Sequence, residues 1–373
     1  MSEERPTFFQ TLLRYVDYPL ALSMIALYVI GVISIYSASV GGGRGHWGYA
    51  YRQLVWGGIS LLAILVVLRI GYRSVLQWAY RIYGVIVCCL VLVLVSGTVA
   101  KGAQSWFSLG GLHLQPSELG KVALALLLGR FSEYGKPETF WGFAVLWGLV
   151  GISLVLVLLQ PDLGSALVYG AMAFVAFLVA GAPRAYLLSL VGAGVAMLPV
   201  GWEFLKPYQR QRLLVFIDPS RDPLGAGYNV IQSRIAVGSG SIWGKGFLQG
   251  TQSKLRFLPE PHTDFVFSVW SEEWGFVGAA LVLLLFGILL WRMLGIAVRC
   301  RDKQGKVMIS ALMAWVWFQV FECVGMSMGI LPVTGLPLPL LSYGGSALLS
   351  NALAFALVMS VGVADELERR EFH

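Results

Sequence analysis

Charged residues are scarce in this chain of 373 residues: 13% are Asp, Glu, Lys or Arg, whereas 57% are hydrophobic. The mean hydropathy is +0.73. Several runs of about 20 apolar residues can be accommodated only as membrane helices, because backbone polar groups in hydrocarbon must bond internally. The composition therefore excludes a soluble domain and predicts an all-α, polytopic membrane protein.

Cysteine and histidine are also rare, with four of each. Cys88, Cys89, Cys300 and Cys323 lie within or at the ends of apolar runs and lack zinc-type spacing. The adjacent Cys88 and Cys89 are not expected to form a disulfide with each other, and we interpret all four as packing residues. Neither an Asp-x-Asp pair nor a His cluster indicates a metal site.

The sequence shows no cleavable signal peptide, because charged residues interrupt its first 17 positions and no small-residue cleavage site follows. It also shows no internal repeat, low-complexity tract or soluble module. We therefore expect residues 1–373 to form a single integral membrane domain. The net charge of +7 is better explained by membrane topology than by nucleic-acid binding.

Ten apolar segments are predicted to span the membrane. The fourth is the weakest, because only Val122–Gly129 is uninterrupted. The eighth contains Trp274–Trp291, an uncharged stretch with a Trp at each end that makes about 27 Å of helix at ~1.5 Å per residue. The predicted spans are 18–38, 49–68, 76–97, 116–131, 140–159, 163–181, 185–202, 265–291, 306–330 and 341–363.

The distribution of Lys and Arg supports this assignment. With the N-terminus in the cytoplasm, 15 of the 27 basic residues fall on the cytoplasmic side, four fall in short outer loops and adjoining span ends, and eight fall in residues 203–264. Such an excess is the positive-inside pattern, from which long loops are largely exempt. Both termini are therefore predicted to be cytoplasmic, and the long loop 203–264 between spans 7 and 8 faces outward.

Loop 203–264 is too long to be a simple connection, and long loops of this kind are usually functional. Between Tyr228 and Val237, apolar residues can line one face of a short helix lying in the membrane interface. The next segment, Gly238–Gly246, is rich in glycine. Beside Lys245 it can cradle a phosphate group, or it can be a flexible turn, which is the commoner role of such a segment.

Ionisable residues inside or beside the spans are costly, and they indicate function. Glu118 and Lys121 are three residues apart at the outer end of the fourth span and share a helix face, either as a site or as a private ion pair. Asp162 lies at the turn before the sixth span, where it can also act as a helix cap. In the ninth span, Gln319 and Glu322 share a face.

Asp264 lies at the entrance of the eighth span, within the sequence PEPHTDF. A carboxylate at that place can be a base acting on a lipid-borne substrate, or a helix cap. The last outer loop, LPVTGLPLPLLSYGGS, is rich in Pro and Gly and includes Ser342 and Tyr343. Irregular backbone at membrane depth is tolerated only where it lines a cavity or is buried in protein. These polar features converge on one leaflet, which favours a site opening outward over a channel.

Several motifs between Gln115 and Ser346, most of the chain, closely resemble those of the SEDS (shape, elongation, division and sporulation) proteins. DPLGAGY and GTQS are similar to the elongation branch, whereas the division branch tends to differ at both places. The motifs that carry the resemblance are QPSELGK, QPDLG, YQRQRLLVFIDP, DPLGAGYNVIQS, GKGFLQGTQS, FLPEPHTDFVF, EEWG and LPVTGLPLPLLSYGGS.

This resemblance implies ten spans and a peptidoglycan glycosyltransferase that polymerises lipid II in the bacterial cytoplasmic (inner) membrane during elongation. It implies a class B penicillin-binding protein as partner, alongside other elongation-complex proteins. Asp264 matches the essential acidic residue of the family. Two pairs match its polar and basic positions: Glu118 with Lys121, and Arg210 with Arg212. One departure is that Cys323, preceded by Glu322, replaces the usual Asn of the ninth span.

The predicted reaction joins a sugar hydroxyl to an anomeric carbon that carries undecaprenyl pyrophosphate. Asp264 would take the hydroxyl proton as general base. Pyrophosphate leaves well as an anion, so no second carboxylic acid is required, unlike in glycoside hydrolysis. The expected substrate-binding and pyrophosphate-binding residues are Glu118, Lys121, Arg210, Arg212, Lys245, Asp162, Ser342 and Tyr343. No cofactor is indicated, although a divalent cation (Mg²⁺ or Mn²⁺) on the pyrophosphate is compatible with the sequence.

Two other functions are considered. A lipid II flippase would distribute polar groups through both leaflets and break helices near the midplane, whereas most polar features here lie on the outer side. A non-catalytic membrane scaffold of the cell-wall elongation complex would need no acidic residue at an outer cleft. The sequence therefore favours the enzyme.

Overall fold

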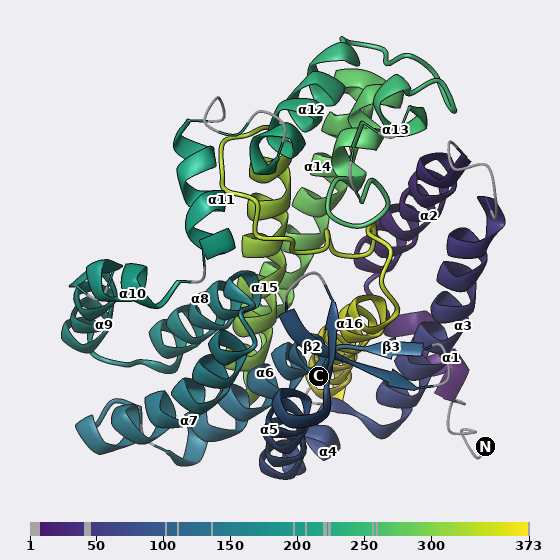
Figure 1. Cartoon of the computed structure of the whole chain (residues 1–373). Coiled ribbons are helices and arrows are strands. Elements are labelled where there is room, and N and C mark those ends of the chain that lie inside the picture. The colour runs from purple at the N-terminus through teal and green to yellow at the C-terminus, as the bar shows by residue number, and fades with distance from the viewer. Residues whose placement is uncertain are drawn as a thin grey trace.

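The computed structural model describes residues 8–40, 46–100, 103–109, 112–135, 137–196, 198–205, 207–218, 222, 225–255, 257–258 and 260–371. Long helices form a bundle, and the helices of the long loop gather at one end of it (Figure 1). We call this end the loop end. Arg5, Arg44, Lys101 and Lys136, used in the topology prediction, lie outside the described residues, as does Pro259.

Each predicted span coincides with helix, so the fold class is confirmed. Among the described residues, eight helices are long and apolar enough to cross a membrane. The exact number of spans therefore stays a prediction for the fourth and seventh segments. The helices at the ten segments are α2 (Tyr18–Val40), α3 (His46–Ile70), α5 (Ala79–Ser96), α6 (Pro116–Tyr134), α7 (Phe140–Leu159), α8 (Leu163–Ala180), α9 (Arg184–Ala196) with α10 (Leu198–Phe204), α14 (Val266–Arg299), α15 (Lys303–Ser327) and α16 (Gly345–Glu371).

The position of helix α6 explains why the fourth predicted span has a weak apolar signal. It packs against α5, α8, α15 and α16, and its side chains from Val122 to Gly129 are all buried. A helix enclosed by other helices contacts little lipid, so it can carry charged residues that a lipid-facing helix could not. The fourth segment is therefore part of the bundle's interior.

Three short strands, which the sequence analysis did not predict, follow α5. They are β1 (Thr98–Ala100), β2 (Ala103–Leu109) and β3 (Leu112–Leu114), and they form an antiparallel sheet in the order β1-β2-β3. β2 packs on α5 and α6, and β3 packs on α16. The sheet adds a small element to a fold that is otherwise helical.

Loop 203–264 contains three helices: α11 (Pro207–Ile217), α12 (Ala226–Ser239) and α13 (Thr251–Lys254). The helix expected at Tyr228–Val237 is thus confirmed. It packs on α14 and α15, with Val230 and Ala236 buried and Ile235 exposed. Two further short helices are α1 (Phe8–Tyr15) and α4 (Tyr72–Gln77). All four cysteines are free thiols.

Helix α14 is broken at Gly275, whose backbone (φ 65°, ψ −160°) is not helical. The glycine-rich segment 241–246 fills the break. Its N–H groups at Lys245 and Gly246 donate to the last carbonyls before the break, at 3.0 Å each. Its carbonyls at 241 and 242 accept from the first N–H groups after the break, at 2.8 and 3.1 Å. The loop therefore satisfies backbone groups that a helix break leaves open.

Candidate active site

The extended segment Val333–Leu338, within the last long connection, organises the polar groups at the loop end. Four of its residues are hydrogen-bonded to polar side chains of neighbouring helices. Arg212 donates to the carbonyl of Val333 (3.4 Å), Thr334 donates to Glu322, Cys323 donates to the carbonyl of Leu336 (3.0 Å) and Gln319 donates to that of Pro337 (2.5 Å). The segment thus joins α11 to one face of α15.

Asp264 lies against this segment. A Cβ built on Gly335 would be 3.6 Å from Oδ2 of Asp264. Asp264 is partly buried, and the N-cap of the helix that follows is Phe265, with no side-chain cap bond. Asp264 therefore does not hold the capping position that was its alternative interpretation.

Ser342 and Tyr343 support the backbone beside Asp264. The Ser342 hydroxyl donates to the carbonyl of Thr263 (2.6 Å), and the Tyr343 N–H donates to that of His262 (2.9 Å). The His262 ring stacks on Tyr49, with centroids 4.4 Å apart, and Tyr343 lies edge-on to both. Sequence reasoning missed this ring cluster, because Tyr49 belongs to α3 and no local pattern connects it with Asp264.

Glu118 and Lys121 form an ion pair of 2.6 Å whose side chains are at most 2% exposed. The Lys121 ammonium also lies 5.2 Å from the ring centre of Trp315 on α15. Trp315 donates to Gln319, which in turn bonds the segment at Pro337. The pair is thereby connected with the segment that contacts Asp264.

Asp162 is the N-cap of α8, where Oδ1 accepts from the N–H of Ser165 (3.0 Å). Its other oxygen accepts from Gln115 (3.2 Å) and Ser117 (3.4 Å) at the start of α6. Nearby, a Cβ on Gly164 would meet Leu336. Asp162 thus caps one helix, and it ties that helix to the one that carries Glu118.

The two arginines of α11, Arg210 and Arg212, bind different partners. Arg212 bonds the segment at Val333, whereas Arg210 turns to α10. There its Nη2 donates to the backbone (2.7 Å) and carboxylate (3.5 Å) of Glu203 and lies over Trp202. The structure therefore brings Arg212, and not Arg210, to the segment beside Asp264.

Lys245 is engaged elsewhere in the loop. Its ammonium pairs with the fully buried carboxylate of Glu272 (2.6 Å) and bonds Thr251 (2.9 Å). Glu272 also accepts from the N–H groups of Thr251 and Gln252, the first residues of α13. The glycine-rich segment beside Lys245 lies in the α14 break as a turn. Glu272 thus holds α13 and this turn on α14.

Glu322 and Thr334 form a contact that the sequence analysis did not predict, although it placed Gln319 and Glu322 on one face. Both side chains on that face do reach the extended segment. Together with Cys323, they join one face of α15 to the segment that lies against Asp264. Among the described residues, no three His, Cys, Asp or Glu side chains gather as a metal site.

Comparison with known proteins places this arrangement in a family. The family model described as "Cell cycle protein", which takes in FtsW, RodA and SpoVE, matches residues 18–366. The peptidoglycan glycosyltransferase MrdB of Escherichia coli (strain K12) is 40% identical over 351 residues, which cover 93% of each chain. The chain therefore belongs to the SEDS family of FtsW, RodA and SpoVE proteins.

Two solved structures share the fold. One, described as showing structural coordination of polymerization and crosslinking by a peptidoglycan synthase complex, has a TM-score of 0.79 at 36% identity and covers 94% of this chain and 98% of that one. The other is the rod shape determining protein RodA of Thermus thermophilus, with a TM-score of 0.70 at 32% identity, covering 93% and 96% of the two chains. The membrane fold is thus shared over nearly the whole length.

Proposed function

The chain is a peptidoglycan glycosyltransferase of the SEDS family, and we propose that it joins lipid II units into glycan strands during cell elongation, with Asp264 as general base. The observation that carries this proposal is the environment of Asp264. It is partly exposed and does not occupy the cap position. The residues just before it are hydrogen-bonded by Ser342 and Tyr343, and its carboxylate lies beside Gly335.

In the proposed reaction, Asp264 accepts a proton and two cations bind the leaving diphosphate. Asp264 accepts the proton of the acceptor hydroxyl, whose oxygen forms a bond to the anomeric carbon of the donor. The bond from that carbon to the lipid diphosphate breaks, and undecaprenyl pyrophosphate leaves as an anion. Arg212, bound to the segment that contacts Asp264, is suited to bidentate contact with the diphosphate. Lys121 would be the second cation, reached along α15 through Trp315 and Gln319.

The other predicted contacts take supporting places in this proposal. Ser342 and Tyr343 bond the backbone at Thr263 and His262, just before Asp264, and Asp162 fixes α8 beside α6. Arg210 and Lys245 would meet substrate only after leaving Glu203 and Glu272. A divalent cation, if used, would enter with the diphosphate. The loop end would face outward, with both termini in the cytoplasm, as the distribution of Lys and Arg predicts.

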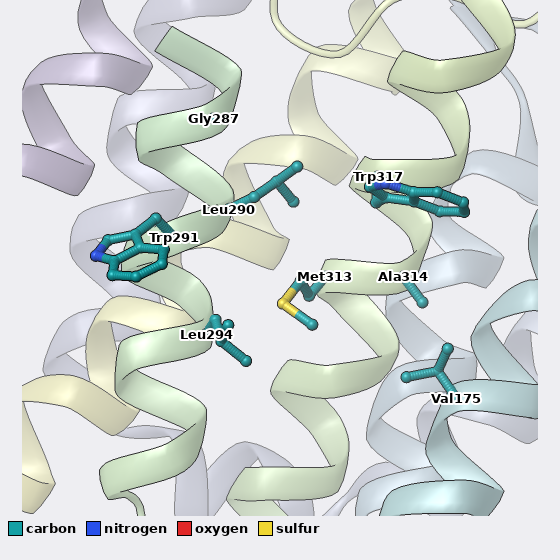
Figure 2. A pocket seen from close by; sticks show the side chains of 8 residues that line it. All are labelled: Val175, Gly287, Leu290, Trp291, Leu294, Met313, Ala314 and Trp317. Atoms are coloured by element: carbon teal, nitrogen blue, oxygen red, sulfur yellow. The ribbon is translucent and has the colours of Figure 1, made fainter. Parts of the chain in front are cut away.

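The partner in this proposal is a class B penicillin-binding protein whose span lies on α14 and α15. Between these helices is an open apolar groove of about 360 Å³, lined by residues that include Gly287, Leu290 and Trp317 (Figure 2). On α14, Gly287 has open space beside it, whereas Gly275 and Gly278 are covered by the chain itself, as are Gly325 and Gly329 near the end of α15. Close packing at small residues drives helix association in lipid, so Gly287 marks the contact.

Polymerisation of labelled lipid II by the purified protein, with and without the partner, tests the function. The Asp264→Asn variant keeps the size of the side chain but cannot accept a proton, so its rate should fall by about 10²-fold or more. A flippase would instead move lipid II in vesicles without making glycan, and a scaffold would do neither. An Asp264→Asn variant that keeps more than a few per cent of the rate (about one part in 10²) would refute the assignment of the base.

A further inference from the structure

Glu322 is a buried carboxyl group inside α15 that the proposed reaction does not use. Its side chain is 3% exposed. The Thr334 hydroxyl donates to Oε1, while Oε2 is buried with no hydrogen-bond partner in the described part of the chain. An ionised carboxylate with a bare oxygen in a low-dielectric interior costs far more free energy than the neutral acid does.

Glu322 lies beside the base. Thr334, which binds it, is followed by Gly335, where an added Cβ would lie 3.6 Å from Oδ2 of Asp264, so one short stretch of backbone joins the two carboxyl groups. Two neighbouring carboxylates resist ionising together. Their surroundings differ, because Asp264 is partly exposed at the N-terminal end of α14, whereas Glu322 is enclosed. Such a difference separates an acid from a base.

We propose that Glu322 is a positioning residue that holds the proton of a carboxyl pair, so that Asp264 remains the only charged member and acts as the base. This inference rests on the proposed glycosyltransferase function. When Glu322 loses its proton at alkaline pH, a second negative charge appears beside Asp264 and the donor diphosphate. That charge disfavours binding of the anionic donor, so the rate falls on the alkaline side.

Several elements around Glu322 carry charged or titratable groups. Among them is Asp162, the N-cap of α8, whose first turn lies against Thr334 at Gly164. Asp264 precedes α14, Cys323 is next to Glu322 on α15, and Lys121 of α6 lies 5.2 Å from the ring centre of Trp315 on the same helix. Arg212 of α11 bonds the residue before Thr334, and Arg234 of α12 lies against Gly329. Among the described residues, none of these three cations forms an ion pair with Glu322, so none fixes its charge.

The test is the pH dependence of lipid II polymerisation by the purified protein with its partner. For the wild type, the rate at pH 9 should be severalfold lower than the rate at pH 7, because pH profiles report the ionisation of groups that the reaction needs in one state. For Glu322→Gln, a permanent mimic of the neutral acid, the ratio of these two rates should stay near one. Thr334→Val removes the hydroxyl that stabilises the ionised form, so it should move the alkaline decline to higher pH.

Glu273→Gln is the matched control. Glu273 is similarly buried in α14 and accepts a hydrogen bond from the Ser37 hydroxyl. The Glu273→Gln variant should therefore keep the wild-type dependence of rate on pH. The inference is overturned if the wild type shows no alkaline decline, if Glu322→Gln keeps it, or if Glu273→Gln also loses it. A wild type that makes no glycan at any pH would instead refute the proposed function itself. Should Glu322→Gln fail to fold, an unshifted Thr334→Val profile refutes the inference.

Discussion

Replacing Lys121 by Met tests whether the buried ion pair of α6 serves the fold or the substrate. The two side chains are at most 2% exposed, and the atoms Nζ and Oε1 are 2.6 Å apart. Met has nearly the length of Lys but no charge, so Lys121→Met leaves the Glu118 carboxyl buried without its cation. Removing one member of a buried pair typically costs about 3–5 kcal/mol, because the remaining charge stays desolvated.

The double variant Glu118→Gln with Lys121→Met removes both charges at nearly constant volume. Replacing a buried pair by neutral groups is often neutral or stabilising, so the stability lost in Lys121→Met should return. If Lys121 holds the diphosphate, polymerisation should not return, because the cation is still missing. The two measurements are the midpoint of thermal unfolding in detergent and the rate of lipid II polymerisation, made on the same preparations.

The exchange of both residues, Glu118→Lys with Lys121→Glu, supplies a second comparison. An i,i+3 pair survives reversal at small cost, whereas a site that must place a cation at a diphosphate does not. Wild-type polymerisation by either double variant would show that the pair is private to the fold. Failure of the neutral double variant to recover stability would refute the energetic reasoning.

Three other predictions concern the groove, the helix break and a buried thiol. Gly287→Cys on α14 should crosslink to a cysteine in the partner's span, whereas cysteines on α3 and α5 should not, and crosslinks confined to α3 and α5 would remove the interface. Gly244→Ala places a Cβ 2.0 Å from the carbonyl oxygen of Glu273 at a φ of +81°, so it should lower the free energy of unfolding by about 1–3 kcal/mol or more. Gly148→Ala, which has open space around the new Cβ, should leave stability unchanged. Equal unfolding midpoints for the two variants would contradict this prediction. Burial, assisted by the Asp302 charge, raises the pKa of Cys300 to about 11. In a variant that lacks the other cysteines, the rate of maleimide labelling of Cys300 should therefore keep rising with pH until about 11. A plateau near the ordinary cysteine pKa of ~8.5 would refute the effect of burial.

The spans could be predicted from the sequence because lipid imposes a local rule, namely a long apolar run for each lipid-facing helix. Helix α12 was also predictable from its local apolar pattern. The roles of single polar residues were only partly predictable. For Asp162 and Asp264 the sequence allowed the same two interpretations, and only the backbone distinguishes them: Asp162 caps α8, whereas the cap of α14 is Phe265.

Contacts between distant segments could not be predicted in this way. The partner of Lys245 is Glu272, 27 residues further on, and the contact of Ser37 with Glu273 joins residues 236 positions apart. No local pattern specifies such pairs, because they depend on how the helices pack. The strands β1–β3 were missed for a different reason: they are three to seven residues long, too short to produce a clear alternation.

The break in α14 changes how a partner can act on Asp264. In an unbroken helix, a push on the groove at Gly287 would reach the start of the helix directly. Here Gly275 separates the two parts, and the turn 241–246 is hydrogen-bonded to both of them. The same turn is linked through Lys245 to Glu272, which holds α13. A displacement of the second part of α14 would therefore be passed through this turn to the first part, which Asp264 precedes. The coupling depends on Gly244 and Gly275, where the two backbones approach closely.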